Sequence, residues 1–361
     1  TGAATAVWHL VDQPCDWNFY LFLQSVIILA EYRELKLDQI IIIKDRRPNY
    51  AKWLLFENIS HTNRFEYRVK NLLLPAVALF PQFKKVLVCE SFTEALGLLG
   101  SKKCIHNNML RCKYGTPTPL KYLCDYALEA KERRLPAPLI KDDTKADLDR
   151  SLGRSSFLSK KRIVTLTVRE VDFDKTRNTN IEDTLRFASL LSSAGYKAVI
   201  IPDSTNLASN WIKDCSFVDE TSIRAATCHE FRYALYCRAF CNYFVPHGFM
   251  DFATFSDNIP YVGMKFVVES YGNPKGSWTA SALYRFVSNK ITWENPEVAD
   301  HYRLSAMNNS FQILNDRFDS IEYLVESFNI FLGLNHNEVT HLSLGNSDCV
   351  YRAMVLDTKE Y

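Results

Sequence analysis

The stretch IVTLTVRE at residues 163–170 decides the fold class of this chain. It is an unbroken run of apolar and β-branched residues that ends at the charged pair Arg169-Glu170. A run without polar alternation is typical of a strand buried on both faces, as in a parallel sheet covered by helices. Strands that alternate with helices predict an α/β fold. Similar runs, separated by helix-like segments, occur at residues 39–43, 86–89 and 197–201.

The α/β pattern occurs in two series, which indicates two Rossmann-like domains facing a cleft. The chain of 361 residues is long enough for about two domains. Between the series, the stretch 136–160 has prolines followed by a dense mixture of acids and bases, as domain connections often do. We therefore expect an N-terminal domain at 1–135, a linker region at 136–160, a C-terminal domain at 161–330 and a C-terminal extension at 331–361.

Local signals give the limits of several elements. Asp16 is placed to cap a helix over residues 17–34, and Ser91 with Glu94 fits a capping box. Gly195 follows the amphipathic segment 181–194 and signals a helix C-terminus. Pro75 should kink or split a helix over residues 63–80. Further strands are expected at 6–11, 243–245 and 261–264, with helical segments at 224–238.

The composition argues against a nucleic-acid partner and against a transmembrane segment. The chain has 43 basic and 41 acidic side chains, without the basic stripe of nucleic-acid-binding proteins. No apolar run reaches the length of about 18 residues that a transmembrane helix needs. Its ten cysteines do not form C-x-x-C pairs, so we interpret them as reduced and the protein as cytoplasmic. The chain starts on Thr1, so additional domains outside it stay an open alternative.

Polar residues follow the ends of several strands in the second series. In open α/β sheets, ligands bind beyond the carboxyl ends of the strands. Arg169 at such an end could hold a diphosphate through paired hydrogen bonds, or form an ion pair at the sheet edge. Gly248 would let the backbone approach an anion, whereas the alternative is a tight turn with His247 at the surface. Asp203 either caps the next helix or faces the ligand.

Two further patterns are weaker. Glu269 precedes a loop with Gly and Pro, where an acid could hold a ribose or sugar hydroxyl or merely cap a turn. The cysteines and histidines between residues 228 and 247 match no zinc spacing. No metal site is therefore expected.

Three segments of the second half together resemble a known family. They are VTLTVR at 164–169, RNTN at 177–180 and AVIIPD at 198–203. They resemble the strand ending in Arg, the Arg-Asn-Ser-Asn motif and the strand ending in Pro-Asp of predicted bacterial glycosyltransferases of GT-B type. The similarity continues through FRYALY at 231–236 and NYFVPHG at 242–248, and covers about residues 160–325. The relatives usually carry Asn-Gly where this chain has His247-Gly248, which leaves the role of the histidine open.

The resemblance implies a GT-B architecture, a nucleotide-sugar donor bound by the C-terminal domain, and a glycan or other acceptor. No cofactor or metal is needed if arginine side chains and a helix N-terminus neutralise the leaving diphosphate. Weak candidates for a catalytic base lie at the end of the first strand, on the expected acceptor side: His9, Asp12 and Asp16. The donor-binding candidates are Arg169, Arg177, Asn178, Asn180, Asp203, His247, Gly248 and Glu269.

Three functions fit these observations. The first is transfer of a sugar from a nucleotide-sugar to an acceptor, in polysaccharide biosynthesis. The second is a sugar-nucleotide epimerase, because the same architecture hosts that reaction and a fold does not fix a function. The third is a non-catalytic glycan- or nucleotide-binding module of a larger protein.

Overall fold

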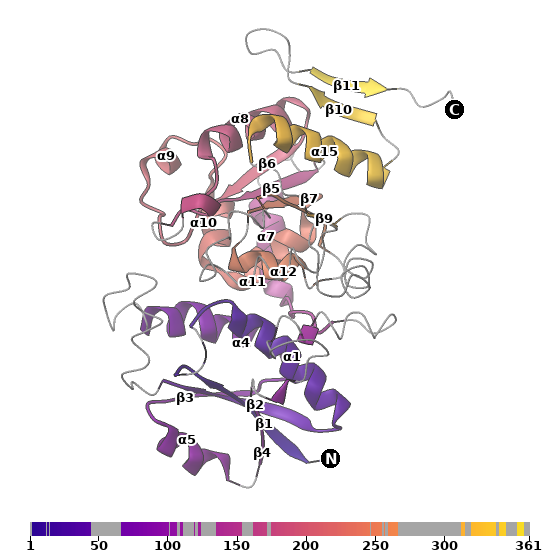
Figure 1. Cartoon of the computed structure of the whole chain (residues 1–361). Coiled ribbons are helices and arrows are strands. Elements are labelled where there is room, and N and C mark those ends of the chain that lie inside the picture. The colour runs from indigo at the N-terminus through magenta and orange to yellow at the C-terminus, as the bar shows by residue number, and fades with distance from the viewer. Residues whose placement is uncertain are drawn as a thin grey trace. The chain divides into compact units, whose positions relative to one another are not determined.

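The protein divides into two compact units, Thr1–Leu139 and Ile140–Tyr361, each described here by itself (Figure 1). The boundary lies inside the stretch 136–160 that the sequence assigns to a linker. Part of this stretch, Asp142–Gly153, forms helix α7, which packs against helices of unit 2. The computed structural model describes residues 2–11, 13, 15–44, 66–100, 102–106, 109–110, 119, 122–123, 135–153, 162–171, 175–245, 247–254, 256, 259–265, 312–314, 319–336, 339–343 and 352–356.

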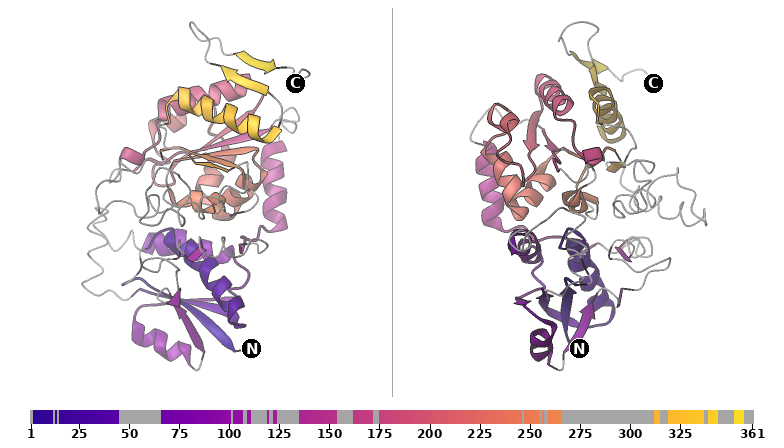
Figure 2. Two further views of the ribbon diagram at one scale, coloured as in Figure 1. Left: turned by 45° about the vertical axis from the view of Figure 1, so that its right-hand side comes forward. Right: turned by 60° about the vertical axis from the view of Figure 1, so that its left-hand side comes forward.

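Unit 1 contains a four-stranded parallel sheet in the order β3-β2-β1-β4. Counted along the chain this is 3-2-1-4, the order found in Rossmann folds. Helices α1 and α4 lie on one face of the sheet and α5 on the other (Figures 1 and 2). The strands are β1 (Ala3–His9), β2 (Lys36–Ile43), β3 (Lys85–Cys89) and β4 (Lys103–His106), and the helices are α1 (Asn18–Tyr32), α4 (Leu74–Ala78) and α5 (Phe92–Leu99).

Helix α1 is deeply buried, since all its residues from Phe19 to Ala30 are buried. Two polar residues interrupt this apolar helix, and both have partners. Gln24 Nε2 donates to the Pro136 carbonyl at 2.8 Å, and Ser25 Oγ donates to the Leu21 carbonyl at 2.8 Å. Within the described part of the chain, no helix combines the length and apolar character needed to cross a membrane.

Unit 2 contains a five-stranded parallel sheet in the order β6-β5-β7-β8-β9. Counted along the unit this is 2-1-3-4-5, the other common order of doubly wound sheets. Helices α8 and α15 lie on one face, and α10, α11 and α12 on the other (Figures 1 and 2). The strands are β5 (Ile163–Thr167), β6 (Lys197–Ile201), β7 (Cys241–Phe244), β8 (Tyr261–Gly263) and β9 (Gln312–Leu314). The helices are α8 (Ile181–Ser193), α9 (Asn210–Lys213), α10 (Glu220–Thr227), α11 (His229–Arg238), α12 (Asp251–Thr254) and α15 (Ile321–His336).

The predicted α/β class and the two Rossmann-like sheets are confirmed. Several local signals also act as expected: Ser91 Oγ accepts the Glu94 N–H at 3.2 Å, and Gly195 ends α8 with φ +90°. Near Pro75 the helix is irregular, because a π-helical turn, Val69–Leu73, comes directly before α4. A separate antiparallel pair, β10 (Val339–Ser343) and β11 (Arg352–Leu356), lies within the predicted C-terminal extension.

Candidate functional site

The sheet of unit 2 changes direction between β5 and β7. From β5 the chain passes through α8 to β6 on one side, and then returns to form β7 on the other side of β5. The carboxyl ends of two such strands border a crevice where ligands of doubly wound proteins bind. Arg169 follows β5, and His247 and Gly248 follow β7, so the structure brings these three predicted residues to the same point of the sheet edge.

Arg169 is held by the RNTN segment that the sequence singled out. Only 5% of the residue is exposed, and its Nη1 donates to Asn178 Oδ1 at 3.0 Å. Its backbone N–H donates to Thr179 Oγ1 at 2.9 Å. The Asn178 amide is itself fixed, because it accepts from the Val171 N–H at 3.0 Å and donates to the Val171 carbonyl at 2.8 Å. A neutral amide orients the guanidinium and leaves its positive charge in place.

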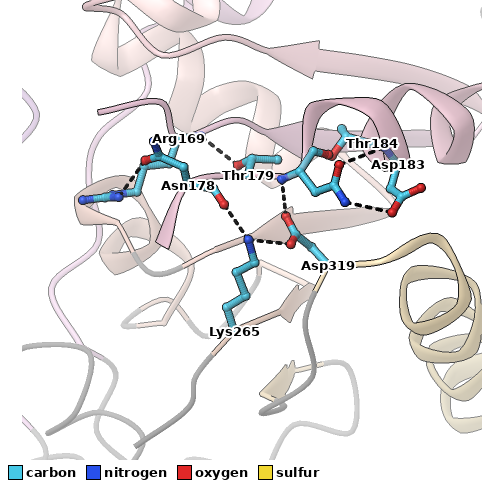
Figure 3. A network of polar contacts seen from close by, with 8 residues as sticks. Arg169, Asn178, Thr179, Asp183, Thr184, Lys265 and Asp319 are labelled. Atoms are coloured by element: carbon cyan, nitrogen blue, oxygen red, sulfur yellow. Dashed lines mark hydrogen bonds and ion pairs between the residues drawn. The ribbon is translucent and has the colours of Figure 1, made fainter. Parts of the chain in front are cut away.

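An ion pair between Lys265 and Asp319 connects the RNTN segment to the residues that follow β8 and to those that precede α15 (Figure 3). Lys265, just beyond β8, donates to the Asn178 carbonyl and pairs with Asp319 at 2.6 Å. The other carboxylate oxygen, Asp319 Oδ2, accepts the Asn180 N–H at 2.7 Å. Asp319 is buried and Lys265 is largely covered, with 4% of the Asp319 side chain and 12% of the Lys265 side chain exposed. Asn180 in turn caps α8, accepting the Asp183 N–H at 3.2 Å.

Lys265 has a strained backbone. Its φ of +60° lies in the left-handed region, which is uncommon for a residue other than glycine. Such a conformation costs about 1–3 kcal/mol and persists where the surroundings fix it. Here the ion pair to Asp319 and the hydrogen bond to Asn178 fix it.

Arg232 on α11 is a buried cation that the sequence analysis did not select. Only 1% of it is exposed, and its guanidinium lies 3.5 Å from the centre of the Phe249 ring. Its Nε donates to the Ala225 carbonyl, and Tyr236, which bonds to Thr167 at 2.9 Å, also bonds to it. Among the described residues its buried Nη2 has no hydrogen-bond partner. Burial lowers the pKa of Arg232, but a guanidinium stays charged at neutral pH.

His247 is a neutral imidazole beside these cations. Its Nδ1 accepts the Phe249 N–H at 3.0 Å, so the ring hydrogen belongs on Nε2. Burial, followed by the charges of Arg232, Arg169 and Arg177, holds the pKa of His247 well below its ordinary value. Within the described part of the chain, the buried Nε2 has no partner.

Gly248 opens a single turn, η6 (Gly248–Met250), followed by the short helix α12. The Phe249 N–H of this turn is already bonded to His247. The groups of this edge that could bind an anion are therefore the side chains of Arg232, Arg169 and His247 more than the backbone of a helix N-terminus.

Asp203 serves the loops of the edge. Its Oδ1 accepts from the Thr205 N–H at 3.0 Å and from the Thr205 hydroxyl at 2.7 Å, so it caps a turn and not a helix. Its Oδ2 accepts the Glu170 N–H at 3.2 Å. This carboxylate connects the loops that follow β5 and β6. Its charge also acts on Arg232, where it raises the pKa against the effect of burial.

The three weak candidates for a catalytic base belong to unit 1, and two of them are described. His9 ends β1 and stacks on Phe92, with ring centres 5.8 Å apart. Asp16 Oδ1 accepts the Asn18 N–H at 2.9 Å at the start of α1. Burial raises the pKa of Asp16, against the hydrogen bonds from Asn18 and the charge of Arg68. Asp12 in unit 1 and Glu269 in unit 2 lie outside the described residues.

Among the described residues, neither a small cavity of unit 2 nor any group of potential metal ligands forms a ligand site. A cavity of about 20 Å³ beside β5 and β7 is lined mainly by apolar groups, with Thr167, Thr179 and Asp319 among the polar ones. This volume suits one water molecule and not a nucleotide. In the described ranges, no three His, Cys, Asp or Glu side chains are grouped closely enough to hold a metal ion.

Comparison with known proteins gives structural neighbours. No family model and no curated protein sequence matches the chain. The structure of ADP-heptose lps heptosyltransferase II from E. coli is 12% identical, with a TM-score of 0.42, over 73% of this chain and 84% of that chain. The glycosyl transferase family 9 protein from Veillonella parvula DSM 2008 is 9% identical, with a TM-score of 0.44, over 73% of this chain and 80% of that chain. Both solved structures are described as glycosyltransferases.

Proposed function

We propose that the chain is a glycosyltransferase of GT-B type that binds the diphosphate of a nucleotide-sugar at the carboxyl edge of the unit 2 sheet. It would transfer the sugar to a glycan or other acceptor in polysaccharide biosynthesis. The observation that carries this proposal is Arg232, a buried cation whose Nη2 has no hydrogen-bond partner in the part of the chain that the structure describes. Its charge and that of Arg169 act together on His247 at the crevice between β5 and β7.

The charges of this edge favour a phosphate-bearing ligand. A buried charge is costly unless it is paired, and a buried donor without a partner loses free energy comparable to a hydrogen bond. A phosphate oxygen compensates both, because it is an anion and an acceptor. Planar guanidinium groups match phosphate oxygens with paired hydrogen bonds.

The same charges suit the chemistry of sugar transfer. When the bond between the sugar and the diphosphate breaks, negative charge develops on the leaving phosphate. Cations already fixed in place stabilise that charge without reorganisation. Arg169 meets this condition, because Asn178 orients it and Val171 fixes Asn178. The arginine charges would then do the work of a metal, and we propose a metal-independent reaction.

Under this proposal the predicted donor-binding residues, together with Arg232, either contact the donor or hold the loops in place. Arg169, Arg177 and Arg232 supply charge, and His247 supplies a neutral donor. Gly248 and Glu269 stay candidates for contacts with the donor. Three others hold the loops in place, since their polar atoms bond to the protein itself: Asn178, Asn180 and Asp203.

Ligand binding and turnover test the proposal. Thermal unfolding is measured with ADP, GDP, UDP, CDP and dTDP and with their sugar derivatives, in the presence of EDTA. A ligand that binds the native state alone raises the unfolding temperature, and we expect at least one diphosphate to do so. Release of the diphosphate only when an acceptor is added supports transfer. A changed sugar without an acceptor indicates an epimerase, and binding without turnover a binding module. No response to any diphosphate overturns the proposal.

Arg169→Ala is expected to weaken binding of the active diphosphate about ten- to hundred-fold, the effect of losing a hydrogen bond to a charged group. The matched control is Arg186→Ala on α8, because Arg186 is half-exposed and pairs with Asp183 at 3.0 Å. Isothermal titration of both folded variants measures the difference. Unchanged affinity in Arg169→Ala would show that this arginine has only a structural role at the sheet edge.

A further inference from the structure

His247 has two ring nitrogens in different situations. Nδ1 accepts the Phe249 N–H at 3.0 Å and so holds the turn that starts at Gly248. Nε2 is buried, and no described residue bonds to it. A buried donor without a partner costs free energy in the ligand-free protein, so its presence requires a reason.

The surroundings of Nε2 indicate what it meets. The His247 ring lies 6.1 Å from the Phe249 ring, and Phe249 in turn covers the guanidinium of Arg232. Arg232 has its own buried atom, Nη2, without a partner in the described ranges. Two donors that lack acceptors among the described residues therefore belong to side chains that both pack against Phe249, and one of them is charged. An anion with several acceptor oxygens satisfies both.

We propose that His247 is a ligand-binding residue with two separate duties: Nδ1 fixes the turn after β7, and Nε2–H donates to a phosphate oxygen of the bound diphosphate. This rests on the proposed function. The imidazole adds a hydrogen bond to the site without adding charge. The positive charge of the site comes from its arginines, and the histidine selects the position of one oxygen.

Two substitutions separate the duties. The side-chain oxygen of Asn occupies about the place of Nδ1, whereas the amide nitrogen of Gln reaches about as far as Nε2. His247→Asn therefore keeps the bond to Phe249 and removes the donor to the ligand. His247→Gln keeps the donor and removes the bond to the turn. A control is His106→Asn, at an exposed position at the end of β4 in unit 1.

The test is isothermal titration with inorganic pyrophosphate, followed by whichever of ADP, GDP, UDP, CDP or dTDP binds wild type. We expect His247→Asn to bind about ten- to hundred-fold more weakly with an unchanged unfolding temperature. His247→Gln should bind close to wild type and unfold at a lower temperature. His106→Asn should match wild type in both.

Nitrogen NMR of labelled histidine gives an independent measurement. In the free protein the His247 ring should carry its hydrogen on Nε2, and the Nε2 resonance should shift when pyrophosphate is added. The inference is overturned if His247→Asn binds pyrophosphate as wild type does, or if the hydrogen lies on Nδ1. If wild type binds neither pyrophosphate nor any of the diphosphates, the proposed function itself fails, and this outcome is distinct from the other two.

Discussion

The two parallel sheets both carry a buried cation at the carboxyl edge, and the two cations differ in their partners. In unit 1, Lys44 follows β2 and donates to Glu66 at 2.8 Å and to Glu90 at 2.7 Å. Burial acts to lower the pKa of Lys44, but the two glutamates outweigh burial and raise it. In unit 2, burial dominates and lowers the pKa of Arg232, whose Nη2 has no partner among the described residues.

The difference separates a structural cation, Lys44, from the cation that is proposed to bind a ligand, Arg232. Lys44 is satisfied by carboxylates of its own unit and has no need of an outside anion. Arg232 is buried without equivalent compensation, so an anion from outside would relieve it. The position of a cation at a sheet edge is therefore insufficient evidence for a phosphate site. Whether its charge is already paired within the protein is the better criterion.

The largest effect should come from a third cation, Lys265, whose partner is buried. Lys265→Met leaves Asp319 as an uncompensated buried charge, which should cost about 3 kcal/mol or more of stability. Lys44→Met leaves glutamates that are partly exposed to water, and should cost about 1 kcal/mol. Amide hydrogen exchange of α8 and of β2, respectively, measures the two losses. Equal losses would show that exposure of the partner does not decide the cost.

Arg232→Met tests the cation of unit 2 in the comparison with Lys44. Binding of pyrophosphate should weaken about hundred-fold, near the upper limit for a charged hydrogen bond. The stability of the ligand-free unit should change little, because the variant loses the bond from Nε to the Ala225 carbonyl but no longer buries a charge whose Nη2 lacks a partner among the described residues. The control is Arg224→Met, since Arg224 also stacks on a phenylalanine, 4.7 Å from the Phe231 ring, and pairs with Asp147. Titration calorimetry and urea unfolding test both variants. A large loss of stability with unchanged binding would make Arg232 structural, like Lys44.

The charge of Arg232 should also have a smaller effect, on the pH dependence of the stability of unit 2. Burial, aided by the charge of Arg232, lowers the pKa of His229 from 6.5 to about 3. The unfolded chain therefore takes up a proton that the folded chain refuses, so this contribution is complete above pH 6.5 and is lost as the pH falls toward 3. Between pH 7 and pH 5 unit 2 should lose about 2 kcal/mol through this group.

His229→Phe tests this value, because the ring packs edge-on against Phe249, with centres 5.3 Å apart, and an aromatic ring can replace it there. Urea unfolding at pH 7, 6 and 5 should show a shallower loss of stability in the variant than in wild type. Parallel pH dependence in the two proteins would contradict the buried, neutral histidine.

The sequence predicted the strands of the sheets well, because their runs are local and apolar. The expected strand at 197–201 matches β6, and the expected strand at 39–43 matches the buried end of β2. Strand β4 was missed, since the sequence KCIH gives too short an apolar run to stand out from a loop. Arg169 and His247 could be selected because the crevice rule needs only the end of a strand.

The other residues of the edge depend on tertiary contacts that local patterns do not encode. Arg232 had one local signal, a charge inside the apolar run FRYALY, but such a charge also occurs on the exposed face of a helix. Lys265 and Asp319 had none, since nothing in either neighbourhood indicates that they form an ion pair. The same holds for Asn178, whose carbonyl meets Lys265 across 87 positions of sequence.

The hydrogen bond from the Asn180 N–H to Asp319 spans 139 positions of sequence. Because the chain is synthesised from its N-terminus, Asn180 leaves the ribosome long before its acceptor, Asp319, has been synthesised. Contacts of such long range also pay their loop-closure entropy late in folding. Strands β5 to β7 can assemble first. The segment that orients Arg169, residues 177–180, reaches its final geometry only after residue 319 has been synthesised. A truncated or stalled chain of unit 2 would therefore hold much of its core and lack the proposed anion site.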